Sequence, residues 1–153
     1  MRRYLIIIGV TLLALTLSTC REYPENPYRP DAHFDITLYP HTRDYELNVV
    51  GGWKYVTSDI FSNSAGLIIF HAPEIEHEEY AFKAYDRLPP NNPYGCCDND
   101  GNCTRLIVDW PYAIDNCNDI KYSLLDGKIS EVDGYDLIQY NTFYDGVTLR
   151  IYN

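Results

Sequence analysis

The feature that most constrains this chain is a series of short segments in which apolar and polar residues alternate. Residues 34–38 and 45–49 alternate at every second position, which is typical of strands with one buried face. Similar candidate strands, each bounded by turn residues, are residues 53–57, 67–70, 80–85, 137–144 and 147–151, with residues 106–108 as a short buried run. Asp145-Gly146 between the last two is a strong hairpin signal. No segment after Cys20 keeps helical periodicity beyond two turns, so the sequence predicts an all-β fold.

The N-terminus predicts export. Met1-Arg2-Arg3 precedes an apolar run, residues 5–17, which is shorter than the roughly 20 residues that a membrane-spanning helix needs. A basic start, a short apolar run and small residues after it indicate a signal peptide over residues 1–19. The run ends near Cys20, as in bacterial lipoproteins, where the cysteine thiol carries a lipid and becomes the new N-terminus. We expect a lipid anchor at Cys20 and a place in the cell envelope, on the periplasmic face or the cell surface. An ordinary signal peptide or a short uncleaved anchor is the alternative.

Residues 20–31 contain three prolines among charged residues, Pro24, Pro27 and Pro30. Such a segment buries little apolar surface, and we expect a semi-extended tether there. An N-terminal strand interrupted by prolines is the alternative. Residues 32–153 are then one β domain, because the mature chain is long enough for one core and too short for two.

The charge balance excludes some partners. The whole chain carries a net charge of −10, and loss of Arg2 and Arg3 with the signal peptide brings it to −12. Such a chain is unsuited to nucleic acid or to electrostatic binding of anionic lipid. We therefore expect no nucleic-acid partner, and a membrane contact only through the lipid. The charge does not identify a protein or ligand partner.

Several segments, in order along the chain, carry a resemblance to a known family. They are residues 51–56 (GGWKYV), 65–70 (AGLIIF), 80–87 (YAFKAYDR), 122–127 (YSLLDG), 137–140 and 144–151. Together they resemble Rieske-type domains of Bacteroidetes lipoproteins over roughly residues 34–153. The resemblance implies three stacked antiparallel sheets, with a small cluster-binding subdomain inserted between strands of the base.

The ligands of a Rieske cluster are missing from the corresponding loops. Family members hold a [2Fe–2S] cluster with Cys-x-His in one loop and Cys-x-x-His in a second. The first loop here reads Leu88-Pro89-Pro90, and the second has Asp115 and Asn118 at the positions of the ligand Cys and His. The only histidines are His33, His41, His71 and His77, all before the first loop. The resemblance thus implies a degenerate scaffold without a cluster, and we expect no cofactor and no bound metal.

The remaining cysteines, Cys96, Cys97, Cys103 and Cys117, suggest disulfides. Their spacing matches neither ferredoxin nor zinc-site patterns, and four cysteines in an exported domain usually form two disulfides. Adjacent Cys96 and Cys97 are poorly placed to bond each other. The family resemblance implies that Cys117 braces the two loops. We therefore expect Cys117 to pair with one upstream cysteine, the other two closing a small loop; a metal site or free thiols are the alternatives.

Two further segments have metal-like composition. Residues 71–79 place His71 and His77 among four acids, and residues 98–102 have the residue types of a calcium loop. Neither has ligand spacing on a rigid element, and we interpret the first as a solvated hairpin loop and the second as a turn. No nucleophile–base pair is recognisable, so we expect no catalytic residues and no enzyme activity.

These observations predict an envelope-anchored lipoprotein with a non-catalytic binding or structural domain. One alternative is electron transfer through a cluster with altered ligation. Another is a surface lipoprotein for adhesion or host contact, whose contact residues are aromatic: Tyr55, Tyr94, Trp110 and Tyr112.

Overall fold

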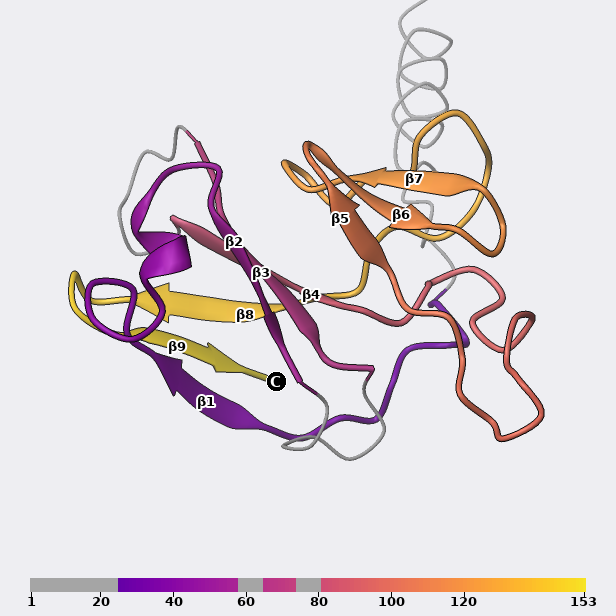
Figure 1. Ribbon diagram of the computed structural model, residues 1–153, viewed down its shortest axis with the longest axis horizontal. Coiled ribbons are helices and arrows are strands. Elements are labelled where there is room, and N and C mark those ends of the chain that lie inside the picture. Colours follow the sequence, from indigo (N-terminus) through magenta and orange to yellow (C-terminus); the bar gives the residue numbers. More distant parts are fainter. Residues whose placement is uncertain (1–24, 58–64, 74–80) are drawn as a thin grey trace, which may run out of the picture.

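The protein is an antiparallel β structure. The computed structural model describes residues 25–57, 65–73 and 81–153, and this part contains nine strands, one short 3₁₀ helix and no α-helix (Figure 1). None of its helices has the length and apolar character that crossing a bilayer requires. The all-β prediction is confirmed. The predicted signal peptide and Cys20 lie outside the described residues.

The larger sheet has six antiparallel strands, and it curls at strand β8, between its first two and its last three strands. Its strands are, in spatial order, β1 (Asp35–Leu38), β9 (Leu149–Tyr152), β8 (Gln139–Tyr144), β4 (Phe82–Asp86), β3 (Leu67–His71) and β2 (Trp53–Val56). Gln139 and Tyr140 of β8 pair with β4, whereas residues 141–144 pair with β9. One strand thus joins two halves of the sheet.

A separate three-stranded antiparallel sheet is inserted in the chain between β4 and β8. It consists of β5 (Ile107–Asp109), β6 (Tyr112–Asp115) and β7 (Ile120–Ser123), in that spatial order. We call residues 87–137 the insert. Figure 1 shows the insert, coloured from salmon to orange, beside the larger sheet.

Strand β3 separates two cores, because its alternate side chains face opposite sides. Leu67 and Ile69 pack in the core enclosed by the curled sheet. Ile68 and Phe70 pack in a second core against residues of the insert, among them Tyr122. These four side chains are fully buried, and only His71, the last residue of β3, is partly exposed. A strand covered on both faces reads as a continuous apolar run, which explains the sequence of β3.

Residues 45–49 do not form the predicted strand. Tyr45–Asn48 is a 3₁₀ helix in which only Leu47 is buried, and Tyr45 is 69% exposed. A single helical turn can bury one side chain and expose its neighbours, just as a half-buried strand does. Alternation over only five residues therefore does not distinguish a helical turn from a strand. The turn packs closely on Gly52, where an added Cβ would lie 2.0 Å from the carbonyl oxygen of Glu46.

The expected buried run at residues 106–108 is wrong in part. Leu106 is fully buried, but Ile107 is 41% exposed, because β5 is an edge strand with one solvent-facing side. The sequence interpretation also predicted no strand over β6 or β7.

The hairpin at Asp145-Gly146 is confirmed, with a longer connection than the dipeptide implies. β8 ends at Tyr144 and β9 begins at Leu149, leaving residues 145–148 as the turn. The Asp145 carboxylate accepts hydrogen bonds from the backbone N–H groups of Val147 and Thr148. Short side-chain acceptors of this kind stabilise turns.

Candidate functional site: the loops and groove of the insert

The insert begins at a buried carboxylate. Asp86, the last residue of β4, is fully buried, and its Oδ1 accepts a hydrogen bond from the Leu88 N–H at 2.7 Å. Its Oδ2 accepts one from the Tyr140 hydroxyl, also at 2.7 Å. Burial and the nearby Asp86 charge raise the pKa of Tyr140. Asp86 thereby fixes the direction in which the first loop, residues 87–106, leaves the larger sheet.

The described part of the expected tether packs on this first loop. The Asn26 amide donates to the carbonyl oxygen of Pro90 at 3.1 Å, and the Tyr28 ring meets the Tyr94 ring edge-on at 6.5 Å. Pro30 is buried. Residues 25–31 therefore lie against the domain and do not extend away from it, which corrects the tether prediction for these residues. Proline has no backbone N–H to donate to a neighbouring strand, so these residues suit an irregular segment that contacts the domain through its side chains.

Asp115 and Asn118, which the family resemblance would align with cluster ligands, shape the second loop, residues 116–119. Asp115 is fully buried; its Oδ1 accepts a hydrogen bond from the Cys117 N–H at 2.9 Å, and its Oδ2 accepts one from the Asn118 amide at 2.7 Å. Asp119 adopts a positive φ of 54° as the loop turns into β7. The side chains of Asp115 and Asn118 thus form hydrogen bonds within the loop itself.

Asn91 connects the first loop to the rest of the insert. Its side-chain oxygen accepts from the Tyr135 N–H at 2.9 Å, while its amide donates to the Tyr135 carbonyl oxygen at 2.9 Å and to the Tyr122 hydroxyl at 3.0 Å. Its backbone oxygen accepts from the Asn118 amide at 3.4 Å. Burial is the main cause that raises the pKa of Tyr122 to about 12. Sequence reasoning missed Asn91, because an Asn after two prolines indicates only a turn.

Two disulfides close the loops. Cys96 is bonded to Cys117, 21 residues later, and Cys97 is bonded to Cys103, six residues later. The predicted arrangement, Cys117 paired upstream and a small loop closed by the other two cysteines, is confirmed. Within the small loop, the Asp98 carboxylate accepts hydrogen bonds from the backbone N–H groups of Asp100 and Asn102. Residues 98–102 are therefore a side-chain-stabilised turn, as predicted.

Among residues 25–57, 65–73 and 81–153, no three His, Cys, Asp or Glu side chains gather in a way that could hold a metal ion. His71 lies at the edge of a core, where its Nδ1 is 2.9 Å from the Leu47 carbonyl oxygen and its ring packs on Phe82. The rest of the predicted 71–79 loop, including His77, is outside the described residues.

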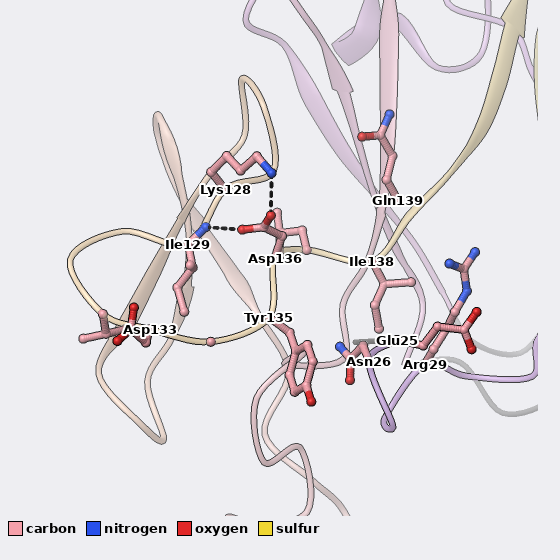
Figure 2. Close-up of a pocket in the computed structure, with 13 residues that line it drawn as sticks. Glu25, Asn26, Arg29, Lys128, Ile129, Asp133, Tyr135, Asp136, Ile138 and Gln139 are labelled. Carbon is pink, nitrogen blue, oxygen red and sulfur yellow. Dashed lines mark hydrogen bonds and ion pairs between the residues drawn. The ribbon is translucent and has the colours of Figure 1, made fainter. Parts of the chain in front are cut away.

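A groove of about 1,010 Å³ lies between the docked N-terminal segment and the end of the insert (Figure 2). One wall is formed by residues 128–136 and the other by Glu25, Asn26 and Arg29. The Asp136 carboxylate shapes the first wall, since it binds Lys128 Nζ at 2.6 Å and accepts from the Ile129 N–H at 3.0 Å. The lining contains side chains of both charges.

The four aromatic residues expected at a contact surface do not form one cluster. The Tyr55 hydroxyl accepts a hydrogen bond from the Val108 N–H at 2.8 Å, so its ring joins the larger sheet to the insert. Tyr94 is 66% exposed in the first loop. Trp110, 49% exposed, and Tyr112 lie at the turn between β5 and β6, where the Trp110 ring packs on Phe70.

No protein-family model, curated protein or solved structure matches the chain. The geometry of the insert is therefore the basis on which a function can be proposed.

Proposed function

We propose that this chain is an envelope-anchored lipoprotein whose β domain, on a Rieske-like scaffold without a cluster, is a non-catalytic binding or structural module. The observation that carries the proposal is the use of the former ligand positions. Asp115 and Asn118 bond to each other and to the loop backbone, and the first loop carries Leu88 and Pro90 at the two other positions. These side chains build a loop and offer no set of metal ligands.

The brace that a cluster provides in Rieske domains has a counterpart here. A [2Fe–2S] cluster ties two loops together through thiolates on one iron and imidazoles on the other. In this chain Cys96–Cys117 joins the same pair of loops covalently, and Asn91 joins them through hydrogen bonds. A cystine sulfur has no thiolate to offer a metal. The arrangement supports a scaffold that keeps its shape and has no redox centre.

The groove of Figure 2 is the candidate binding face of this module. Its volume of about 1,010 Å³ is at the upper end of the range for ligand pockets, roughly 300–1,000 Å³. Asn91 and Asp136 hold its insert wall through backbone hydrogen bonds to Tyr135 and Ile129. A wall fixed in this way is preorganised, which lowers the entropic cost of binding. Side chains of both charges, such as Arg29 and Asp133, favour a polar ligand.

The absence of a cluster is tested by producing the protein anaerobically with iron and cysteine in excess. We expect a colourless protein without the visible charge-transfer bands of a [2Fe–2S] centre and without stoichiometric iron by elemental analysis. A protein with the four ligands restored, Leu88→Cys, Pro90→His, Asp115→Cys and Asn118→His, is the comparison. About two iron atoms per unsubstituted chain would support the electron-transfer alternative instead.

The lipid anchor is tested with a Cys20→Ser variant in a bacterial host. We expect it to lose labelling by a fatty-acid probe and to leave the membrane pellet, because the thiol that carries the lipid is gone. Thr19→Ala, which keeps the cysteine, should stay labelled and membrane-bound. A Cys20→Ser protein that remains in the pellet would indicate an uncleaved anchor.

Adhesion or host contact is a second candidate, favoured by the exposed apolar end of the molecule. An added Cβ on Gly51 would lie 3.9 Å from the Trp110 ring, so the chain segment that carries exposed Val49 and Val50 passes close to exposed Trp110. Grouped exposed apolar side chains are typical of contact surfaces. If this surface is used, Trp110→Ala should weaken attachment of protein-coated beads to host cells, whereas Phe143→Ala, which removes an exposed side chain of β8, should not.

A further inference from the structure

Two arginines, Arg87 and Arg105, are brought close by backbone pairing where the insert joins the larger sheet. The backbone oxygen of Arg87 accepts a hydrogen bond from the Leu106 N–H at 2.8 Å, and Arg87 Nε donates to the Leu106 carbonyl oxygen at 3.3 Å. This pairing places Arg105, the residue before Leu106, next to Arg87. The Arg105 charge is close enough to lower the pKa of Arg87, although burial of Arg87 is the larger cause.

The Arg87 guanidinium is held in a fixed orientation. It lies over the Tyr55 ring, 3.8 Å from the ring centre, and Tyr55 is in turn fixed by its hydrogen bond to the Val108 N–H. Trp53 packs beside Tyr55, with ring centres 4.8 Å apart. A guanidinium stacked in this way has less side-chain freedom to lose when it binds.

In the part of the chain that the structure describes, no carboxylate forms an ion pair with Arg87 or Arg105. The neighbouring Asp86 carboxylate is engaged by Leu88 and Tyr140. Acids are abundant, since the chain has 22 Asp and Glu against 12 Lys and Arg. Other described cations, such as Arg150 with Asp35, do have acidic partners. Arg29, Arg43, Lys83 and Lys121 also have no carboxylate partner among the described residues, but Arg87 lacks one while it is half-buried and close to a second arginine.

We propose that Arg87 and Arg105 bind an oxyanion, the carboxylate or phosphate group of a small ligand, on the Tyr55 platform. Burying part of a positive charge beside a like charge is unfavourable, and an oxyanion between the two guanidiniums offsets this cost. Arginine remains protonated at physiological pH and presents planar forks that match both groups. These residues are not in the groove, so this site is independent of the function proposed for it.

The test is calorimetric titration of the full-length protein with inorganic phosphate and, separately, with succinate, at constant ionic strength in chloride. We expect saturable binding of at least one anion. Arg105→Gln, an exposed substitution, should weaken that binding by about tenfold or more, as for loss of a charge-assisted hydrogen bond. Arg87→Lys should also weaken it, because lysine keeps the charge but has no planar fork. Arg150→Gln, at an arginine paired with Asp35, should leave the affinity unchanged.

The outcomes separate the possibilities. Phosphate binding alone assigns a phosphate group, and succinate binding alone assigns a carboxylate. Absence of saturable binding, or equal affinity of wild type and Arg105→Gln, overturns the site.

Discussion

Removing the Cys96–Cys117 disulfide should destabilise the domain more than removing Cys97–Cys103. In the chain-entropy model, a crosslink over 21 residues stabilises by about 3 kcal/mol and one over six residues by about 2 kcal/mol. The longer crosslink also joins both loops of the insert, whereas the shorter one lies within the first loop. For a domain of this size, losses of about 3 and 2 kcal/mol correspond to decreases in melting temperature of about 10 and 6 °C.

The assay is thermal unfolding of two double variants, Cys96→Ala/Cys117→Ala and Cys97→Ala/Cys103→Ala, in which no unpaired thiol remains. Trypsin provides a local readout, because Arg105 lies between Cys96 and Cys117. We expect the first variant to be cut after Arg105 several times faster than the second. Equal melting temperatures with equal cutting rates would refute the view that Cys96–Cys117 braces the loops. Four free thiols in the native, oxidised protein would refute the pairing itself.

Two further predictions follow from buried polar groups. Asn91→Ala removes three side-chain hydrogen bonds to Tyr122 and Tyr135 and should lower the free energy of unfolding by about 1–3 kcal/mol in urea, whereas the exposed Asn141→Ala should change it by less than about 0.5 kcal/mol. Burial raises the pKa of Tyr122 to about 12, above its ordinary value of 10.0. The contribution of neutral Tyr122 to the free energy of unfolding is therefore fully present below pH 10 and is lost as the pH rises towards 12. Urea midpoints should fall over this range, and less steeply for Tyr122→Phe; identical slopes would contradict the assignment.

The strand pattern of this protein could be predicted well from its sequence, for a local reason. Whether a side chain faces the core or the solvent is set every second residue along a strand, so alternation in β1 and the apolar run of β3 report burial directly. The pairing of Cys117 with an upstream cysteine was predictable for another reason, since four cysteines in an exported domain usually form two disulfides and the family resemblance implied Cys117 as the brace. Residues 45–49 were not, because five residues with one buried side chain fit a helical turn equally well.

Patterning determined the all-β class, and the cysteines together with the family resemblance predicted a cross-linked insert. Only the tertiary structure decided which polar groups meet. Asn91 forms hydrogen bonds with Tyr135, 44 residues later. The Arg87 guanidinium stacks on the ring of Tyr55, which belongs to the edge strand β2. Neither contact leaves a local signal, because a hydrogen bond or a cation–π contact requires proximity in space and no particular spacing in sequence. The groove likewise exists only because residues 25–29 return to lie opposite residues 128–136.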